Sequence, residues 1–89
     1  MIIYNLEGDV EMTNEEKYVN AFVECFGITE DQTEELKYQD VKEWDSIGHM
    51  DLIATLEEAF DIMMDMDDVV AFSSFRKGKE IMSKYGIDI

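Results

Sequence analysis

Two stretches of the chain place apolar residues three and four positions apart, and this spacing limits the possible folds more than any other feature. A period of 3.6 residues puts such side chains on one face of an α-helix. The stretches span about 13–26 and 46–60. Thr13 and Glu16 form a capping box before the first, and Gly27 follows its last apolar residue. The spacing therefore predicts two amphipathic helices.

Two further helices are expected in the C-terminal third. Asp65 can cap a short helix at about 67–71, because an aspartate side chain can accept hydrogen bonds from unpaired helix amides. Ser73 or Ser74 can cap a final helix in the same way, and Gly86 follows its last apolar residue. The pattern predicts one short helix followed by a longer one.

Residues 28–44 lie between the two long helices, are polar and show no sustained period. A turn of helix is expected around Gln32–Tyr38. Isolated apolar anchors in this segment are Ile28, Leu36, Tyr38, Val41 and Trp44. We therefore expect an all-α domain over 13–89, a small four-helix bundle of three longer helices and one short helix, with a long loop between the first two. Residues 1–12 would be an N-terminal extension, interpreted as a mobile tail.

The chain carries 22 acidic and seven basic residues, for a formal net charge of −15. So acidic a surface excludes nucleic acid as a partner, since phosphate contacts need basic residues, and it disfavours an anionic membrane surface. Residues 76–89 are the exception, with four basic and two acidic residues, and are expected to dock against the acidic remainder. A weak cation-binding cluster is expected at Asp65, Asp67 and Asp68.

Three features predict a cytoplasmic protein. No apolar run approaches the roughly 18 residues of a spanning helix, so no membrane insertion is expected. The N-terminal residues lack the basic leader of a signal peptide. The single cysteine, Cys25, cannot form an internal disulfide and is expected to be an inert apolar side chain on the first helix.

Few residues offer metal-binding or catalytic chemistry. Asp61–Phe72 matches an EF-hand loop poorly, because it lacks the required glycine and the bidentate glutamate. One histidine and one cysteine far apart do not make a transition-metal site, so no bound metal is expected. Ser46, His49 and Asp45 resemble the parts of a hydrolase site, but Asp45 directly precedes Ser46 and is badly placed to orient His49. We therefore expect no enzymatic activity and an exposed His49 without a role.

Ser46 stands at the expected start of a helix, directly after the long loop. The unpaired amides and partial positive charge of a helix N-terminus would stabilise a phosphate attached to its hydroxyl. On these grounds alone, a plain capping serine remains the simpler interpretation.

The sequence around Ser46 resembles the acyl carrier protein family. Residues 45–62 read DSIGHMDLIATLEEAFDI. The family shows Asp-Ser-Leu, then a Glu-Leu or Asp-Leu pair, then Leu-Glu-Glu-x-Phe, and its order of helices resembles the one expected over 13–85. The departures from its pattern are Ile47, Gly48, His49 and Asp65.

The resemblance implies that Ser46 is the attachment point of 4′-phosphopantetheine, which a phosphopantetheinyl transferase takes from coenzyme A with the help of magnesium. Asp45 would assist the metal in the transfer complex, and the terminal thiol of the arm would carry an acyl group as a thioester. The chain would thus be a non-catalytic, monomeric carrier in fatty acid or polyketide biosynthesis. Its partners would be the transferase, an acyl- or aminoacyl-loading ligase, and acyl-transfer or synthase enzymes.

The resemblance also implies a recognition surface on the second expected helix, facing basic docking patches on these enzymes. Its acidic and apolar positions are matched by Asp51, Glu57, Glu58, Ile47, Met50 and Ala54. The family's core positions, some of which line space that an acyl chain can enter, are matched by Leu52, Leu56, Phe60, Ile62 and Met64. Two alternatives stay open: an aminoacyl, D-alanyl or peptidyl carrier, and an unmodified acidic helical adaptor that binds a basic partner.

Overall fold

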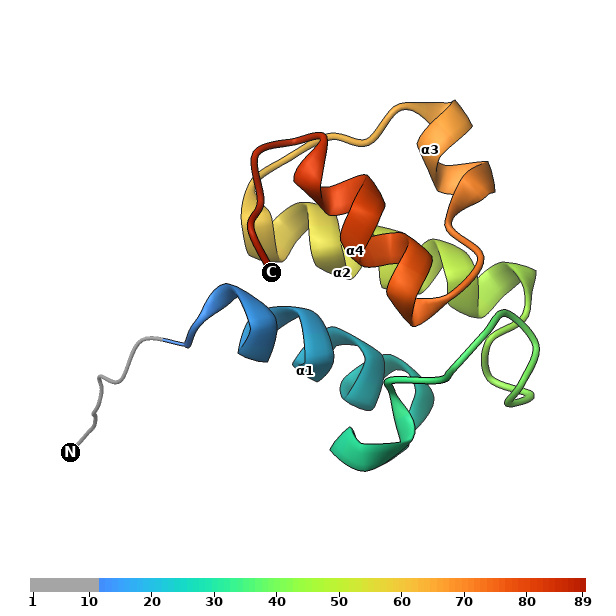
Figure 1. Ribbon diagram of the computed structural model, residues 1–89. Coiled ribbons are helices and arrows are strands. Elements are labelled where there is room, and N and C mark those ends of the chain that lie inside the picture. The colour runs from blue at the N-terminus through green and yellow to red at the C-terminus, as the bar shows by residue number, and fades with distance from the viewer. Residues whose placement is uncertain (1–11) are drawn as a thin grey trace, which may run out of the picture.

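Four α-helices and one short 3₁₀ helix follow one another along residues 12–89, the part of the chain that the computed structural model describes (Figure 1). In chain order they are α1 (Asn14–Phe26), η1 (Glu30–Gln32), α2 (Ser46–Phe60), α3 (Met66–Ala71) and α4 (Phe75–Ser83). The predicted all-α fold of three longer helices and one short helix is confirmed. The interpretation of residues 1–12 as an extension falls, except for Met12, outside the described residues and stays a prediction.

Local side-chain chemistry explains where α1 begins and ends. The Thr13 hydroxyl accepts a hydrogen bond from the Glu16 amide at 3.1 Å, and a Glu16 carboxylate oxygen accepts one from the Thr13 amide at 2.8 Å. This capping box satisfies two amides that have no partner inside the helix. Gly27 adopts a left-handed conformation (φ 65°), and its N–H donates to the Val23 carbonyl. Both predicted helix signals are confirmed.

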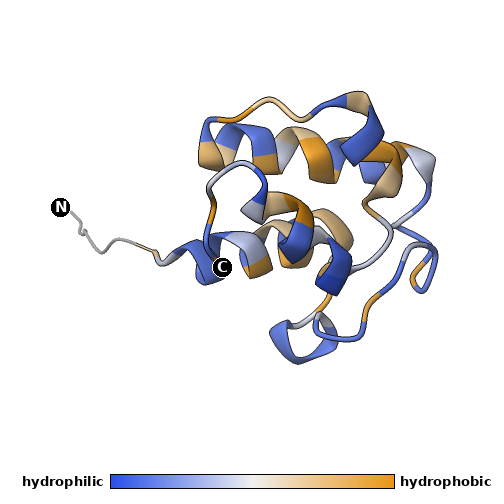
Figure 2. Ribbon diagram, turned by 45° about the horizontal axis from the view of Figure 1, so that its top comes forward, coloured by the Kyte–Doolittle hydropathy of each residue, from blue (hydrophilic) through white to orange (hydrophobic). Residues whose placement is uncertain are grey.

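The core is built mainly from aromatic rings, with neighbouring ring centroids 4.8–6.5 Å apart. The rings belong to Tyr18, Phe22, Phe26, Trp44, Phe72 and Phe75. Helix α2 adds the buried side chains of Leu52 and Leu56 to this core. Hydrophobic and hydrophilic stretches alternate along the helices (Figure 2), as expected of elements that bury one face. The Tyr18 hydroxyl donates to the Phe75 carbonyl at 2.6 Å, and burial raises the pKa of Tyr18.

The long connection between α1 and α2 is held in place by its apolar anchors. Ile28, Leu36 and Trp44 are buried, as expected, whereas Tyr38 is 37% exposed. The Leu36 carbonyl accepts a hydrogen bond from the Phe75 amide, and the Tyr38 amide donates to the Ser73 carbonyl, each at 2.9 Å. These bonds join the connection to the segment between α3 and α4 and to the first residue of α4.

The expected turn of helix around Gln32–Tyr38 is wrong. The helical turn lies earlier, in η1, because Thr29 and Gln32 cap it: the Thr29 amide donates to the Gln32 side-chain oxygen at 2.8 Å. The backbone of residues 36–38 instead pairs with the segment before α4. A non-local pairing has replaced the local turn that the sequence favoured.

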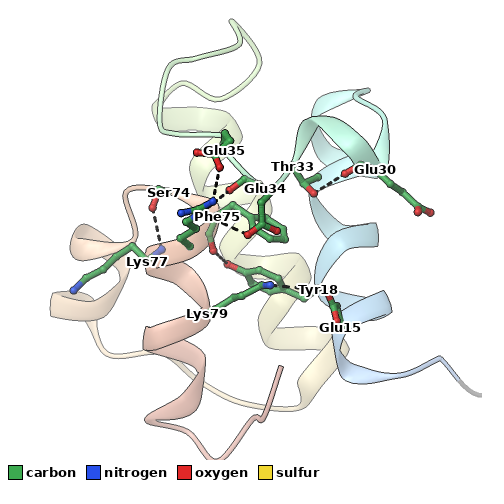
Figure 3. A network of polar contacts seen from close by, with 11 residues as sticks. Glu15, Tyr18, Glu30, Thr33, Glu34, Glu35, Ser74, Phe75, Lys77 and Lys79 are labelled. Atoms are coloured by element: carbon green, nitrogen blue, oxygen red, sulfur yellow. Dashed lines mark hydrogen bonds and ion pairs between the residues drawn. The ribbon is translucent and has the colours of Figure 1, made fainter.

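The basic C-terminal segment docks against acidic residues, as predicted. Arg76 pairs with Glu34 and Glu35 of the long connection, and Lys79 Nζ lies 3.9 Å from a carboxylate oxygen of Glu15 on α1 (Figure 3). These cations stand in the first half of α4, where the helix dipole does not favour them. The acidic neighbours explain their position. In residues 12–89 no helix combines the length and the apolar character needed to cross a bilayer.

Candidate functional site

Ser46 is the first residue of α2, and its hydroxyl is not used to cap the helix. Asp45 is the capping residue: its Oδ1 accepts a hydrogen bond from the Gly48 amide at 2.8 Å. Ser46 is exposed, and its hydroxyl makes no hydrogen bond within the described residues. Because Asp45 holds the helix start, the Ser46 hydroxyl is left free for chemistry.

Gly48 allows the end of the long connection to lie tightly against the first turn of α2. A Cβ atom at this position would lie 1.8 Å from the carbonyl oxygen of Glu43, far inside van der Waals contact. The obstacle is backbone, which cannot swing away as a flexible side chain can. The glycine at position 48 therefore has a structural reason next to Ser46.

The expectation that His49 is exposed and without a role is wrong. Its ring is partly buried, and both ring nitrogens are hydrogen-bonded. Nδ1 accepts from the indole N–H of Trp44 at 2.9 Å, and Nε2 lies 2.8 Å from the Val69 carbonyl oxygen. An indole N–H can only donate, so Nδ1 carries no proton and Nε2–H donates to Val69. His49 thus ties α2 both to the long connection and to α3, an arrangement that its sequence position does not reveal.

A groove of about 400 Å³ opens beside Ser46, between the start of α2 and helix α3. It is predominantly apolar, and three of its side chains, Met50, Met66 and Val70, are 52%, 70% and 76% exposed. The nine lining residues are Tyr38, Ser46, His49, Met50, Met66, Val69, Val70, Phe72 and Ser73.

Sequence reasoning singled out Ser46 and Met50 but missed the part of the groove that α3 supplies. Met66 and Val70 are four positions apart on α3, which places them on one face of that helix. That spacing was the available signal. It did not reveal which other helix the face would meet.

Hydrogen bonds to Asp68 also join helix α3 to the C-terminal end of the chain. This carboxylate is buried and accepts hydrogen bonds from Lys84 Nζ at 2.6 Å and from the Tyr85 hydroxyl at 2.5 Å. The Tyr85 hydroxyl in turn accepts from the Asp65 amide at 2.9 Å. The bonds from Lys84 and Tyr85 lower the pKa of Asp68.

The expected weak cation cluster at Asp65, Asp67 and Asp68 is therefore wrong, because Lys84 already neutralises Asp68. Within residues 12–89, no three His, Cys, Asp or Glu side chains are grouped so that they could hold a metal ion. Cys25 is partly buried, with its sulfur 3.5 Å from the Thr55 hydroxyl.

Five of the six expected recognition residues form an exposed surface on α2, which we call the α2 face: Ile47, Met50, Asp51, Ala54 and Glu58. The sixth, Glu57, is half-buried. One of its carboxylate oxygens accepts a hydrogen bond from the Met64 amide at 2.9 Å, so it stabilises the turn between α2 and α3. Ile47 is 75% exposed, although the apolar spacing along α2 would allow it to be buried.

Comparison of the chain with protein-family models, with curated proteins and with solved structures finds no match.

Proposed function

We propose that this chain is an acyl carrier protein that carries acyl intermediates as thioesters on a 4′-phosphopantetheine arm attached to Ser46. The observation that carries the proposal is the free Ser46 hydroxyl at the start of α2, on the rim of an apolar groove. A site for a flexible arm needs an exposed nucleophile and an adjacent surface on which the arm can rest. The residues present fit such a group, and the groove lies within the usual size range of small-molecule sites.

The attachment step is a phosphoryl transfer. The Ser46 oxygen attacks the phosphorus nearer to pantetheine in coenzyme A, and a new O–P bond forms. The bond between that phosphorus and the bridging oxygen of the pyrophosphate breaks, adenosine 3′,5′-bisphosphate leaves, and the serine proton passes to a base of the transferase. Within the described residues, Asp45 Oδ2 makes no hydrogen bond, so it can help hold the transferase's Mg²⁺, which would neutralise charge on the phosphates.

The α2 face suits transient contact with several enzymes. Asp51 and Glu58 supply negative charge, and Ile47 supplies an apolar contact one residue from Ser46. Complementary charge speeds encounter and sets orientation more than it deepens affinity, which suits a carrier that must be released quickly. We propose that the transferase, the loading ligase and the synthase enzymes present basic patches to this face. The carrier would act as a cytoplasmic monomer.

Intact-mass spectrometry after co-expression with a promiscuous phosphopantetheinyl transferase tests the attachment site. We expect the mass of one phosphopantetheine on the wild type and none on Ser46→Ala. Ser73→Ala is the matched control, because Ser73 is a second exposed serine that lines the same groove, and it should be modified like the wild type. An unmodified wild type would favour the alternative of an acidic adaptor. Modification of the Ser46→Ala variant would show that Ser46 is not the attachment point.

A further inference from the structure

We infer that the group carried on Ser46 is a short, uncharged, apolar acyl group, and that it lies in the surface groove rather than in the interior of the bundle. This inference rests on the proposed function and specifies its cargo. Three observations support it: an interior filled by rings, a groove whose apolar wall is exposed, and a lining that offers no charge to a charged cargo.

The interior leaves little room for an acyl chain. Trp44, Tyr18, Phe22, Phe72 and Phe75 are each at most 1% exposed and pack ring against ring. A rigid ring cannot fold aside as a methionine or leucine side chain can. Added methylene groups would have to displace closely packed rings, and overpacking of this kind is costly. We therefore expect the acyl chain to stay out of the space among the core positions of α2 that the resemblance implies.

The groove, by contrast, offers apolar surface at the attachment point itself. Met50, Met66 and Val70 are all more than half exposed, on a chain with 22 acidic residues. Covering these side chains with a hydrocarbon group removes apolar area from water, which is favourable. The groove must also accommodate part of the arm, so the cargo that it can cover is short.

The lining also selects against a charged cargo. None of the nine lining residues carries a formal charge when His49 is neutral. His49 cannot pair with a cargo in this arrangement, because Trp44 occupies Nδ1 and the Val69 carbonyl occupies Nε2–H. The ammonium group of an aminoacyl cargo would lose water in the groove without gaining a carboxylate partner. An aminoacyl cargo would therefore stay in solvent.

The test uses the full chain loaded at Ser46 by a promiscuous transferase, with coenzyme A derivatives bearing a bare arm, a hexanoyl amide or a D-alanyl amide. The amide link prevents hydrolysis during measurement. Backbone amide shifts in ¹H–¹⁵N spectra are compared with those of the bare-arm form. We expect the hexanoyl group to shift groove residues such as Met66 and Val70, with much smaller changes at core residues such as Phe22 and Leu56. The D-alanyl group should shift the groove residues several-fold less.

A matched pair of variants locates the contact. Met66→Glu puts a charge on the groove wall, whereas Met63→Glu puts one at a second well-exposed methionine outside the groove; the two residues are 70% and 84% exposed. The hexanoyl-induced shifts should be lost in Met66→Glu and kept in Met63→Glu. Any of three outcomes would overturn the inference. The hexanoyl group could shift core residues more than groove residues, or the D-alanyl group could shift the groove residues as much as the hexanoyl group does. The hexanoyl-induced shifts could also persist in Met66→Glu. Failure of the transferase to load the wild type at all would instead overturn the proposed function.

Discussion

Replacing His49 with phenylalanine should destabilise the fold strongly, although the position is only partly buried. Phenylalanine keeps an aromatic ring beside Trp44 but removes both hydrogen bonds of the imidazole. Trp44 is fully buried, so its indole N–H would be left without an acceptor, at a cost of about 1–3 kcal/mol. Val69 lines the groove, so water can replace the bond that its carbonyl loses, at a cost of about 0.5–1.5 kcal/mol.

The two terms together predict a loss of about 1.5–4.5 kcal/mol, and hence a fall in Tm on the order of 6–35 °C for a domain of this size. Urea unfolding followed by far-ultraviolet circular dichroism measures the free energy of unfolding directly. The same substitution is then made in a Trp44→Phe background, which has no indole N–H to leave unpaired. There we expect His49→Phe to cost at least about 1 kcal/mol less, because the coupled partner is already gone.

Two outcomes would refute this reasoning. The first is a cost below about 0.5 kcal/mol for His49→Phe in the otherwise wild-type chain, which is the range of an ordinary surface substitution. The second is an equal cost in both backgrounds. An equal cost would mean that the imidazole does not act through its bond to Trp44. A cost below about 0.5 kcal/mol would mean that neither bond of the imidazole contributes, and that α3 is positioned by Asp68 and packing alone.

Three further predictions concern acid stability, the start of α2 and recognition. Because the pKa of Asp68 is lowered, its pairing stabilises the fold above the ordinary aspartate pKa, and this stabilisation is lost as pH falls through the folded pKa. The difference in the free energy of unfolding between wild type and Asp68→Asn, measured by urea unfolding, should therefore shrink toward low pH. A difference that does not change with pH would contradict this. Gly48→Ala should destabilise by about 1–3 kcal/mol in thermal melts, because the added methyl meets the Glu43 carbonyl, whereas Gly to Ala inside a helix normally stabilises by about 1 kcal/mol. Glu58→Lys on the α2 face should slow loading by the transferase several-fold and weaken its dependence on salt, while Glu80→Lys on α4 should not; equal effects would mean that only net charge matters.

Much of the fold follows from local chemistry, which is why sequence reasoning could reach it. The capping box of Thr13 and Glu16 and the left-handed Gly27 involve residues at most four positions apart, so their effect hardly depends on the rest of the chain. The bounds of α2 and the place of Ser46 at its start were likewise predictable from apolar spacing and capping residues. The excess of acidic over basic residues in 1–75 similarly predicted that the basic end of the chain would dock against acidic residues of this segment.

What sequence reasoning missed lies in contacts between residues far apart in the chain. His49 donates a hydrogen bond to the carbonyl of Val69, 20 residues away, and Asp68 accepts one from Lys84, 16 residues away. Periodicity assigns a side chain to a face of its own helix but does not say which helix or loop that face will meet. The groove beside Ser46 depends on such contacts, since its walls come from α2, α3, the long connection and the segment between α3 and α4. Its shape follows from how the helices pack around the buried rings, because packing sets the distance and angle between elements that the chain itself connects only loosely.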